Sequence, residues 1–363
     1  MDLNELFSGC YAGRRVLITG HTGFKGSWLA FWLRSMGANV AGLSLDPDTE
    51  LSHWELLGLD DVADYRVDLR NAAAVREVFD LHKPEMVFHL AAQALVRRSY
   101  KKPATTFDIN VMGLINVFEA IRHCPSVRIV VNATTDKVYE DHLNPNGYSE
   151  TDPLGGHDPY SSSKACAEIV SACYRKSFFA TQTDISVPRL ATARAGNVIG
   201  GGDWADDRLV PDLIRAAISG NALKIRNPDS TRPWQHVLEP LSAYLRLGQL
   251  LLENGAYSEA WNFGPQKQDE RNVKEVVSLL SKCWHDIRVE MDNQPHPHEA
   301  AALHLNCEAA KQKLGWQPVW HLETAIEKTA AWYRRQHESG QLNTADDLDA
   351  YISDARKLGL AWT

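Results

Sequence analysis

Long apolar runs are missing from this chain of 363 residues. No stretch approaches the roughly 20 apolar residues of a membrane-spanning helix, and the opening MDLNELFSGC lacks the basic start and apolar core of a signal peptide. A Lys/Arg-rich block is missing too, and the formal net charge is -8, which argues against nucleic acid as the main partner. We therefore expect a cytoplasmic protein that binds a small molecule.

Closely spaced cysteine pairs are also missing. The chain has no C-x-x-C pair and no cysteine spacing typical of a zinc site, so we expect reduced, structural thiols with no nucleophile among them. The six cysteines are Cys10, Cys124, Cys166, Cys173, Cys283 and Cys307.

One histidine-rich stretch, QPHPHEAAALH, brings together His296, His298, Glu299 and His304. Its prolines interrupt any helix, and the histidine spacing after Glu299 differs from that of zinc proteases. We expect a loop that faces a ligand here, and no metal site.

Short β-branched runs alternate with longer helical patterns from Arg14 to about Leu190. The runs show little polar alternation, which is typical of strands buried on both faces. Strands are predicted at residues 14–20, 38–45, 63–69, 85–92, 127–134 and 183–194. Helices are predicted at residues 24–36, 71–82, 103–123 and 159–179. This order predicts an α/β fold, a Rossmann-like doubly wound parallel sheet whose ligands bind at the carboxyl ends of the strands.

The pattern changes after Gly196, where segments rich in Gly, Pro, Asn and Asp separate helices expected at 209–219 and 239–254. The short run AWNFG is expected to return one more strand to the sheet. The second region is therefore predicted to be smaller, discontinuous and mostly helical. The predicted division is a first domain at 1–195, with a return near 239–264, and a substrate-binding region at 196–238 and 265–363.

The stretch GHTGFKG spaces Gly20, Gly23 and Gly26 as G-x-x-G-x-x-G, directly after the strand VLIT and at the start of a predicted helix. This context is typical of a dinucleotide-binding loop, although glycines alone are weak evidence. Missing side chains let the backbone approach a ligand, and the amino end of the helix attracts a pyrophosphate. The loop therefore predicts a dinucleotide cofactor.

Acidic residues follow the second and third predicted strands. Asp46 lies 20 residues after Gly26, the spacing expected of a carboxylate that binds a ribose diol and repels a 2′-phosphate, which favours NAD over NADP. Asp46 could instead be a turn residue before Pro47, and Asp48 is its nearby rival. Asp68 is placed to reach an adenine amino group, with the same alternative.

The segment PYSSSKA places Tyr160 and Lys164 four residues apart in a predicted helix, so that both side chains point the same way. A lysine ammonium favours the phenolate and is expected to lower the pKa of the tyrosine. Tyr160 could then take a hydroxyl proton near neutral pH, with Thr134 sharing the hydrogen bond.

Taken together, GHTGFKG, HLAAQ, Thr134 and the Tyr160–Lys164 motif resemble the extended short-chain dehydrogenase/reductase family, from about Gly13 to the end of the chain. Within it, the segment TTDK resembles the nucleotide-sugar 4,6-dehydratases of deoxysugar biosynthesis. The related dTDP-glucose enzymes carry an acid where this chain has Lys137, a departure that indicates the CDP-sugar branch. The resemblance implies a lyase with NAD as cofactor and CDP-glucose as substrate.

The implied reaction needs an elimination pair beside the oxidation site. Tyr160 would deprotonate the 4-hydroxyl while hydride passes to NAD, and the 4-ketone would then acidify the C5–H bond. Asp136 is the expected acid for the departing 6-hydroxyl, which requires a pKa raised by burial. Lys137 is either the C5 base or a cation that stabilises the enolate. A nucleotide-sugar epimerase needs no such pair and is the alternative, with a non-catalytic NAD sensor more remote.

The resemblance also implies ligand contacts and an assembly. Substrate contacts are expected at Arg194, Asn197, Arg208, Leu209 and Arg232, although an isolated arginine is more often a surface ion-pair partner. The helices 103–123 and 159–179 would pair across a twofold axis, giving a homodimer or homotetramer. Cofactor contacts are expected at Gly20, Thr22, Gly23, Phe24, Lys25, Gly26, Asp46, Asp68, Leu69, Leu90, Ala91, Ala92, Gln93, Thr134, Tyr160 and Lys164.

Overall fold

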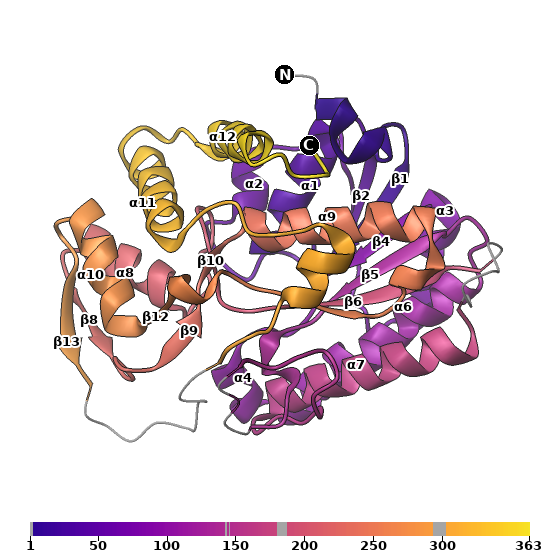
Figure 1. Cartoon of the computed structure of the whole chain (residues 1–363), viewed down its shortest axis with the longest axis horizontal. Helices are drawn as coiled ribbons and strands as arrows, with labels where there is room; N and C mark the ends of the chain where they lie inside the picture. The colour runs from indigo at the N-terminus through magenta and orange to yellow at the C-terminus, as the bar shows by residue number, and fades with distance from the viewer. Residues whose placement is uncertain (1–2, 142–143, 145, 180–186, 293–302) are drawn as a thin grey trace.

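A seven-stranded sheet forms the centre of the fold (Figure 1). The computed structural model describes the whole chain except residues 1–2, 142–143, 145, 180–186 and 293–302. The strands of this sheet are β1 (Arg15–Thr19), β2 (Asn39–Ser44), β3 (Ala63–Arg66), β4 (Met86–His89), β5 (Ile129–Ala133), β6 (Arg189–Ala195) and β11 (Ala260–Phe263). Their order is β11-β6-β5-β4-β1-β2-β3, and every neighbouring pair is parallel. The doubly wound sheet and the returning strand are confirmed, and the predicted first residues of the sixth strand lie outside the described residues.

Most strands of the sheet are covered on both faces. Val16 and Ile18 of β1 belong to one core, and Leu17 between them belongs to the other. Such strands can be apolar throughout because helices lie above and below them. β3 differs, since Ala63 and Asp64 are exposed. The prediction that this strand is buried on both faces is wrong, because β3 is the edge strand and pairs with β2 alone.

Helices cover the two faces of the sheet in separate groups. α1 and α9 pack on one core, and α3, α6 and α7 pack on the other (Figure 1). In the described part of the chain, none of the helices combines the length and the apolar character needed to cross a membrane. The α-helices are α1 (Phe24–Ser35), α2 (His53–Leu57), α3 (Ala72–His82), α4 (Val96–Lys101), α5 (Pro103–Phe107), α6 (Gly113–Arg122), α7 (Pro159–Ser177), α8 (Leu209–Ile218), α9 (Leu238–Glu253), α10 (Val273–Cys283), α11 (Leu322–Ser339) and α12 (Thr344–Lys357).

The predicted helix at 103–123 contains a wider turn. α5 runs through the π-helical turn η2 (Asp108–Met112) into α6, so the helical path is continuous but not uniformly α-helical. Asn110, at the middle of η2, is buried and donates from Nδ2 to the carbonyl oxygen of Gln93 at 3.0 Å and to Ser163 Oγ at 2.8 Å. These bonds tie the turn to the segment after β4 and to α7, which a periodic apolar pattern does not reveal.

Small paired strands and short turns build the region next to the sheet. β7 (Val198–Ile199) pairs with β10 (Gln235–His236), β9 (Thr231–Pro233) with β12 (Glu270–Asn272), and β8 (Ala222–Ile225) with β13 (Arg288–Met291). The remaining turns are η1 (Leu3–Gly9), η3 (Asp136–Val138), η4 (Gly255–Tyr257), η5 (Lys267–Asp269) and η6 (Ala310–Leu314). The division of the chain into two domains stays a prediction.

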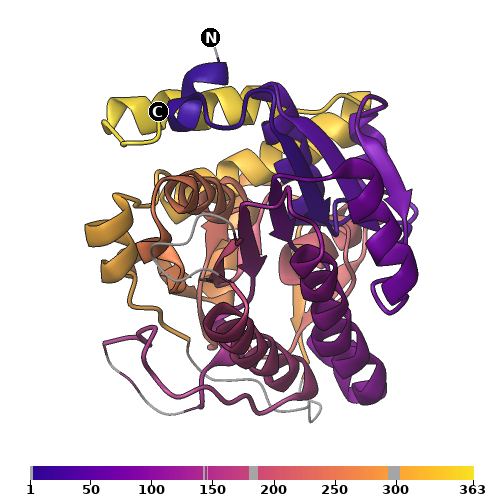
Figure 2. The same cartoon turned by 90° about the vertical axis from the view of Figure 1, so that its right-hand side faces the viewer.

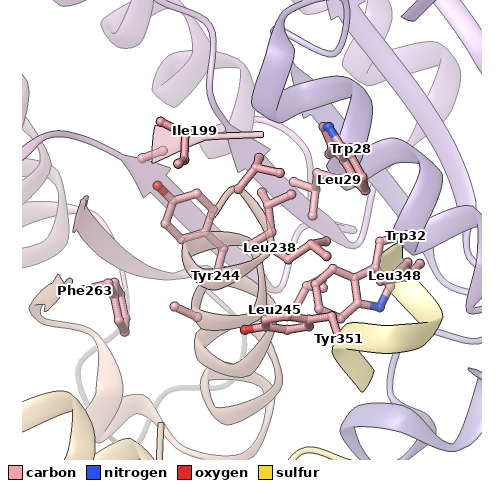
Figure 3. Packing of buried hydrophobic residues seen from close by; sticks show 14 of the residues in the cluster. Trp28, Leu29, Trp32, Ile199, Leu238, Tyr244, Leu245, Phe263, Leu348 and Tyr351 are labelled. Carbon is pink, nitrogen blue, oxygen red and sulfur yellow. The ribbon is translucent and has the colours of Figure 1, made fainter. Parts of the chain in front are cut away.

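Aromatic side chains join the C-terminal helices to the first helix. Trp32 of α1 meets Tyr351 of α12 edge to face, with ring centroids 6.0 Å apart (Figure 3). Phe7 stacks on Trp362 at 5.1 Å, and α12 lies along this N-terminal segment at the top of Figure 2. The end of the chain therefore packs into the same core as β1.

Candidate active site

In the glycine loop, backbone segments lie too close together for side chains at Gly20 and Gly26. Gly20 has φ +78°, a left-handed conformation that favours glycine, and a Cβ on Gly26 would lie 2.0 Å from the carbonyl oxygen of Gly20. Gly23 is different, because a Cβ there would meet that oxygen at an ordinary 3.4 Å. Gly23 is also the N-cap of α1 and provides no side-chain cap. The loop thus leaves the amino end of α1 open to an outside anion, which fits the pyrophosphate of a dinucleotide.

The two acids predicted to bind the adenosine half lie beyond their strands, as expected. Asp46 is 89% exposed and lies 3.4 Å from Arg66, whereas Asp68 pairs with Arg70 at 2.6 Å. The Arg70 hydrogen bonds lower the pKa of Asp68. Their contacts with a cofactor stay predictions.

The side chains of two other predicted cofactor residues, Leu69 and Gln93, already contact other parts of the protein. Leu69 is buried in the core and packs against Gly113. A Cβ added to Gly113 would lie only 2.9 Å from the Leu69 side chain. The Gln93 amide donates to Thr106 Oγ1 at 3.0 Å and accepts from the Leu95 backbone at 2.7 Å. Both side chains are held by other residues of the protein, and their contacts with a cofactor stay predictions.

A cavity of about 330 Å³ lies beyond the carboxyl ends of β4, β5 and β6. Its volume suits a small polar ligand, and it contains most of the residues named for the reaction and many of those named for ligand contacts. The predicted residues that line it are Lys25, Leu90, Ala92, Thr134, Asp136, Lys137, Tyr160, Lys164, Asn197, Arg208, Leu209 and Arg232.

The turn after β5 places a buried acid in this cavity. Thr135 is the N-cap of η3 and donates from Oγ1 to Asp136 Oδ1 at 2.9 Å. The other carboxyl oxygen, Oδ2, is buried and has no partner among the described residues. Burial raises the pKa of Asp136, against the opposing effects of Lys137, Thr135 and Arg232. Asp136 is therefore disposed to hold a proton and to present it to a ligand.

The hydroxyl beside Tyr160 belongs to Thr135, and not to Thr134 as predicted. Thr134 Oγ1 donates to the buried Glu168 Oε1 at 2.5 Å, on the face of β5 that α7 covers. Asn132 points the same way and donates to Ser171 of α7. Because side chains alternate along a strand, the next residue, Thr135, turns into the cavity and hydrogen-bonds to Tyr160.

The start of α7 fixes the tyrosine and the lysine. Asp158 caps the helix by accepting from the Ser161 backbone at 2.9 Å, and Lys164 Nζ donates to the carbonyl oxygen of Ala133 at 3.0 Å. Burial lowers the pKa of Lys164 to about 8. Burial also raises the pKa of Tyr160 to about 12, and Asp136 adds to the rise. The predicted lowering of this pKa is wrong for the ligand-free protein, because desolvation of the phenol outweighs its cationic neighbours.

Arg194 does not reach the cavity, contrary to the prediction of a substrate contact. Its Nη2 pairs with Glu168 Oε2 at 3.0 Å, and its Nη1 donates to the hydroxyl of Tyr139 at 2.8 Å and to the carbonyl oxygen of Glu150 at 3.2 Å. Arg194 and Glu168 are both almost fully buried, and Glu168 accepts from Thr134 as well. The guanidinium is therefore part of an internal network behind the cavity wall.

Basic side chains gather at the end of the cavity formed by α8 and β8. Arg208 pairs with Asp203 at 3.3 Å, and Arg232 is buried in β9. Lys224 of β8 and Arg226 just after it line the same end, and neither was predicted. The alternating pattern of LKIR, which places two cations on one side of an extended segment, was the available signal. This end is suited to a phosphate-bearing ligand.

The histidine-rich stretch is only partly described. His296, His298 and Glu299 lie outside the described residues, whereas His304 Nδ1 lies 2.6 Å from Glu270 Oε2. Over the described ranges, no three His, Cys, Asp or Glu side chains are grouped as metal ligands.

Comparison with known proteins places these residues in a wider group. Residues 17–329 match the family model described as GDP-mannose 4,6 dehydratase. The CDP-glucose 4,6-dehydratase of Salmonella typhimurium is 46% identical over 329 residues, with 89% of this chain and 91% of the relative covered. The dTDP-glucose 4,6-dehydratase of Xanthomonas campestris pv. campestris is 26% identical over 340 residues, covering 87% of this chain and 92% of its own.

Solved structures share the fold. The UDP-glucose 4-epimerase of Thermus thermophilus, in complex with NAD, is 25% identical with a TM-score of 0.74 and covers 88% of this chain and 99% of its own. The dTDP-glucose 4,6-dehydratase DesIV of Streptomyces venezuelae also has a TM-score of 0.74, at 21% identity, covering 89% and 98%. The likeness to the second structure concerns the fold alone.

Proposed function

The chain belongs to the GDP-mannose 4,6-dehydratase family, and from that premise we propose that it converts CDP-glucose into CDP-4-keto-6-deoxyglucose and water with NAD as cofactor. The relative at 46% identity, named as a CDP-glucose 4,6-dehydratase, supports the choice of substrate. The NAD complex of the related epimerase supports the choice of cofactor, as does the open amino end of α1. One observation carries the dehydration itself: the buried, unpartnered Oδ2 of Asp136 lies in the same cavity as Tyr160 and Lys164.

Oxidation at C4 is assigned to Tyr160 and its neighbours. Thr135 and Tyr160 hold the 4-hydroxyl, and Tyr160 takes its proton. NAD, when bound, supplies the acceptor for the C4 hydride and later returns that hydride to C6. Because burial raises the pKa of the phenol to about 12, the phenolate needs a nearby cation, and Lys164 is the one that α7 supplies.

Elimination is assigned to the turn after β5. The 4-ketone acidifies C5–H, a base removes this proton, and Asp136 gives its own proton to the 6-hydroxyl, which leaves as water. The hydride then returns to C6 and a proton returns to C5, while the proton taken from the 4-hydroxyl restores Asp136. Lys137, whose charge opposes the pKa rise of Asp136, supplies either the base or the positive charge that stabilises the enolate. A Lys137→Arg variant keeps the charge without a usable base and separates these two roles.

The nucleotide is assigned to the basic end of the cavity. Arg208 and Arg232 provide forked donors for the diphosphate, and Leu209 at the start of α8 packs on the base. Lys224 and Arg226 extend this positive end. The proposal makes no use of Arg194.

The helices of the sheet's outer face are assigned to a homodimer or homotetramer. Met112, Ile169 and Phe178 are exposed apolar residues on or just after η2 and α7, and contacts between such helices in two copies would cover them. The six free thiols support a reducing compartment, the cytoplasm. Sedimentation of the wild type beside Ile169→Asp tests the assembly, because a charge at the interface should release a smaller species.

A substrate panel tests the proposed reaction. The purified protein is incubated with NAD and, in separate reactions, with CDP-, dTDP-, UDP- and GDP-glucose and GDP-mannose, and each product is examined for loss of water. CDP-glucose should give a 4-keto product that absorbs in strong base, without net accumulation of NADH. Tyr160→Phe should bind NAD and give no product. Interconversion of C4 epimers without water loss would identify an epimerase instead, and full activity of Tyr160→Phe would refute the catalytic assignment.

A further inference from the structure

Lys25 of the glycine loop reaches into the reaction cavity. It is the second residue of α1, and its side chain lines the cavity together with Tyr160. Its Nζ lies 3.4 Å from the hydroxyl of Tyr244 and 5.8 Å from the centroid of that ring. Among the described residues this hydroxyl is its hydrogen-bond partner, and no carboxylate forms an ion pair with it. Lys164 of α7 and Lys25 of α1 therefore line the same cavity.

The groups that face Lys25 come from α7, η3, α9 and the start of α8. Burial lowers its pKa to about 7, and the positive charges of Lys164 on α7 and Arg208 before α8 act in the same direction. Asp136 on η3 acts in the opposite direction. The remaining neighbour, Tyr244 on α9, is a phenol whose own pKa burial raises, so it stays neutral. The charge of Lys25 therefore changes within the physiological pH range.

The position of Lys25 fixes which part of a dinucleotide it meets. The pyrophosphate is expected at the open amino end of α1, and the ring that exchanges hydride with the sugar is expected next to Tyr160. Lys25 lies at the start of α1, and its side chain lines the cavity that contains Tyr160. Its charge therefore acts on the ring, which is cationic when oxidised and neutral when reduced.

We propose that Lys25 makes the site discriminate between oxidised and reduced cofactor, with the protonated amine opposing NAD⁺ and leaving NADH unaffected. The proposal rests on the proposed function, because it takes NAD as the cofactor. Below the pKa of Lys25 the ammonium and the oxidised ring repel each other, so NAD⁺ binds weakly. Above that pKa the amine is neutral and NAD⁺ binds more tightly, while binding of NADH changes little.

Coulomb's law sets the size of the effect. Two unit charges about 6 Å apart, at an effective dielectric constant of about 20, shift a pKa by about two units. The ratio of the two dissociation constants should then change by up to about 100-fold between the acidic and alkaline limits. A change of about tenfold or more across neutral pH is the expected result.

Binding titrations of the full-length protein test this without turnover. Dissociation constants of NAD⁺ and NADH are measured by calorimetry from about pH 6 to about pH 8.5 for the wild type, Lys25→Met and Lys25→Arg. The wild type should show the pH-dependent ratio. Lys25→Met should bind NAD⁺ more tightly than the wild type at acidic pH, and Lys25→Arg more weakly than the wild type at alkaline pH. Lys164, whose pKa is about 8, is present in all three proteins, so the effect of Lys25 is read from the difference between the wild type and each variant.

The outcomes separate this proposal from the proposed function. Equal NAD⁺/NADH ratios in the wild type and Lys25→Met at every pH would overturn the role of Lys25 and leave the dehydratase assignment intact. Failure of the wild type to bind either nucleotide would overturn the cofactor assignment itself. If Lys25→Met does not fold, Lys25→Arg still decides, because it must lose the pH dependence of the ratio while keeping NADH affinity.

Discussion

Replacing Asp136 by asparagine removes a transferable proton from the cavity and changes little else. The side chain keeps its size, and its Oδ1 can still accept the hydrogen bond from Thr135, which is 2.9 Å long in the wild type. Burial raises the pKa of Asp136 and so disfavours its charged form, and a neutral amide of the same size fits the same place. We therefore expect the thermal midpoint of Asp136→Asn to shift by about 2 °C or less.

The expected catalytic loss follows from the unpartnered Oδ2. This oxygen is the atom from which the departing 6-hydroxyl would take its proton, and an amide nitrogen cannot supply one. A positioned general acid contributes about 100- to 10,000-fold to a rate, so water loss should fall by that factor. Oxidation at C4 uses Tyr160 and should continue. Bound NADH should therefore accumulate in the variant, although the wild type returns it within each cycle.

Two readouts on the same sample measure this. Stopped-flow absorbance of the reduced nicotinamide follows oxidation, and alkaline absorbance of the 4-keto-6-deoxy product follows dehydration. Asp61→Asn is a matched control, since this exposed carboxylate pairs with Arg34 outside the cavity. Dehydration by Asp136→Asn at more than about a tenth of the wild-type rate would contradict the role of this acid.

Three other changes test the surroundings of the site. Thr135→Val should lower the rate of oxidation about tenfold or more and cost about 0.5–2 kcal/mol for the lost cap of η3, whereas Thr134→Val should cost about 1.5–3 kcal/mol in a urea titration and leave the rate within about threefold. Arg194→Met should destabilise the fold by about 3–5 kcal/mol in the same titration, because it leaves the buried Glu168 carboxylate unpaired, and a cost under about 1 kcal/mol would show that the pair is not a structural clamp. Gly23→Ala should fold normally but bind NAD about tenfold more weakly by calorimetry, and unchanged affinity would exclude the open end of α1 as the pyrophosphate site.

The sheet could be predicted because its physical cause is local. A strand covered by helices on both faces must be apolar throughout, and Val16, Leu17 and Ile18 show this in the sequence before any neighbour is known. Which strand is at the edge depends on pairing, so the exposure of Asp64 was missed. The π-helical turn was missed for a similar reason, since it depends on partners of Asn110 in α7 and in the segment after β4.

The site shows the same division between local and distant causes. Tyr160 and Lys164 could be placed together because four residues are about one helical turn. Thr134 and Thr135 are adjacent and chemically alike, so the choice between them required the position of α7 and its Glu168. Arg194 was misassigned because the same carboxylate, 26 residues earlier in the chain, takes up its charge.

Burial shifts the pKa of each reacting group in the direction that favours its neutral form. The pH dependence of the reaction therefore follows from the structure. It raises the pKa of Asp136, raises that of Tyr160 to about 12, and lowers those of Lys164 and Lys25 to about 8 and about 7. Each shift favours the neutral form, so burial weakens the charge on each of these four groups. An acid with a raised pKa is protonated below that value, so dehydration should fall as pH rises through it. Oxidation needs the lysine charge and should fall as pH rises through the pKa of Lys164. With NAD saturating and oxidation faster than elimination, a rate of water loss that rises steadily from neutral to alkaline pH would therefore contradict the role of Asp136.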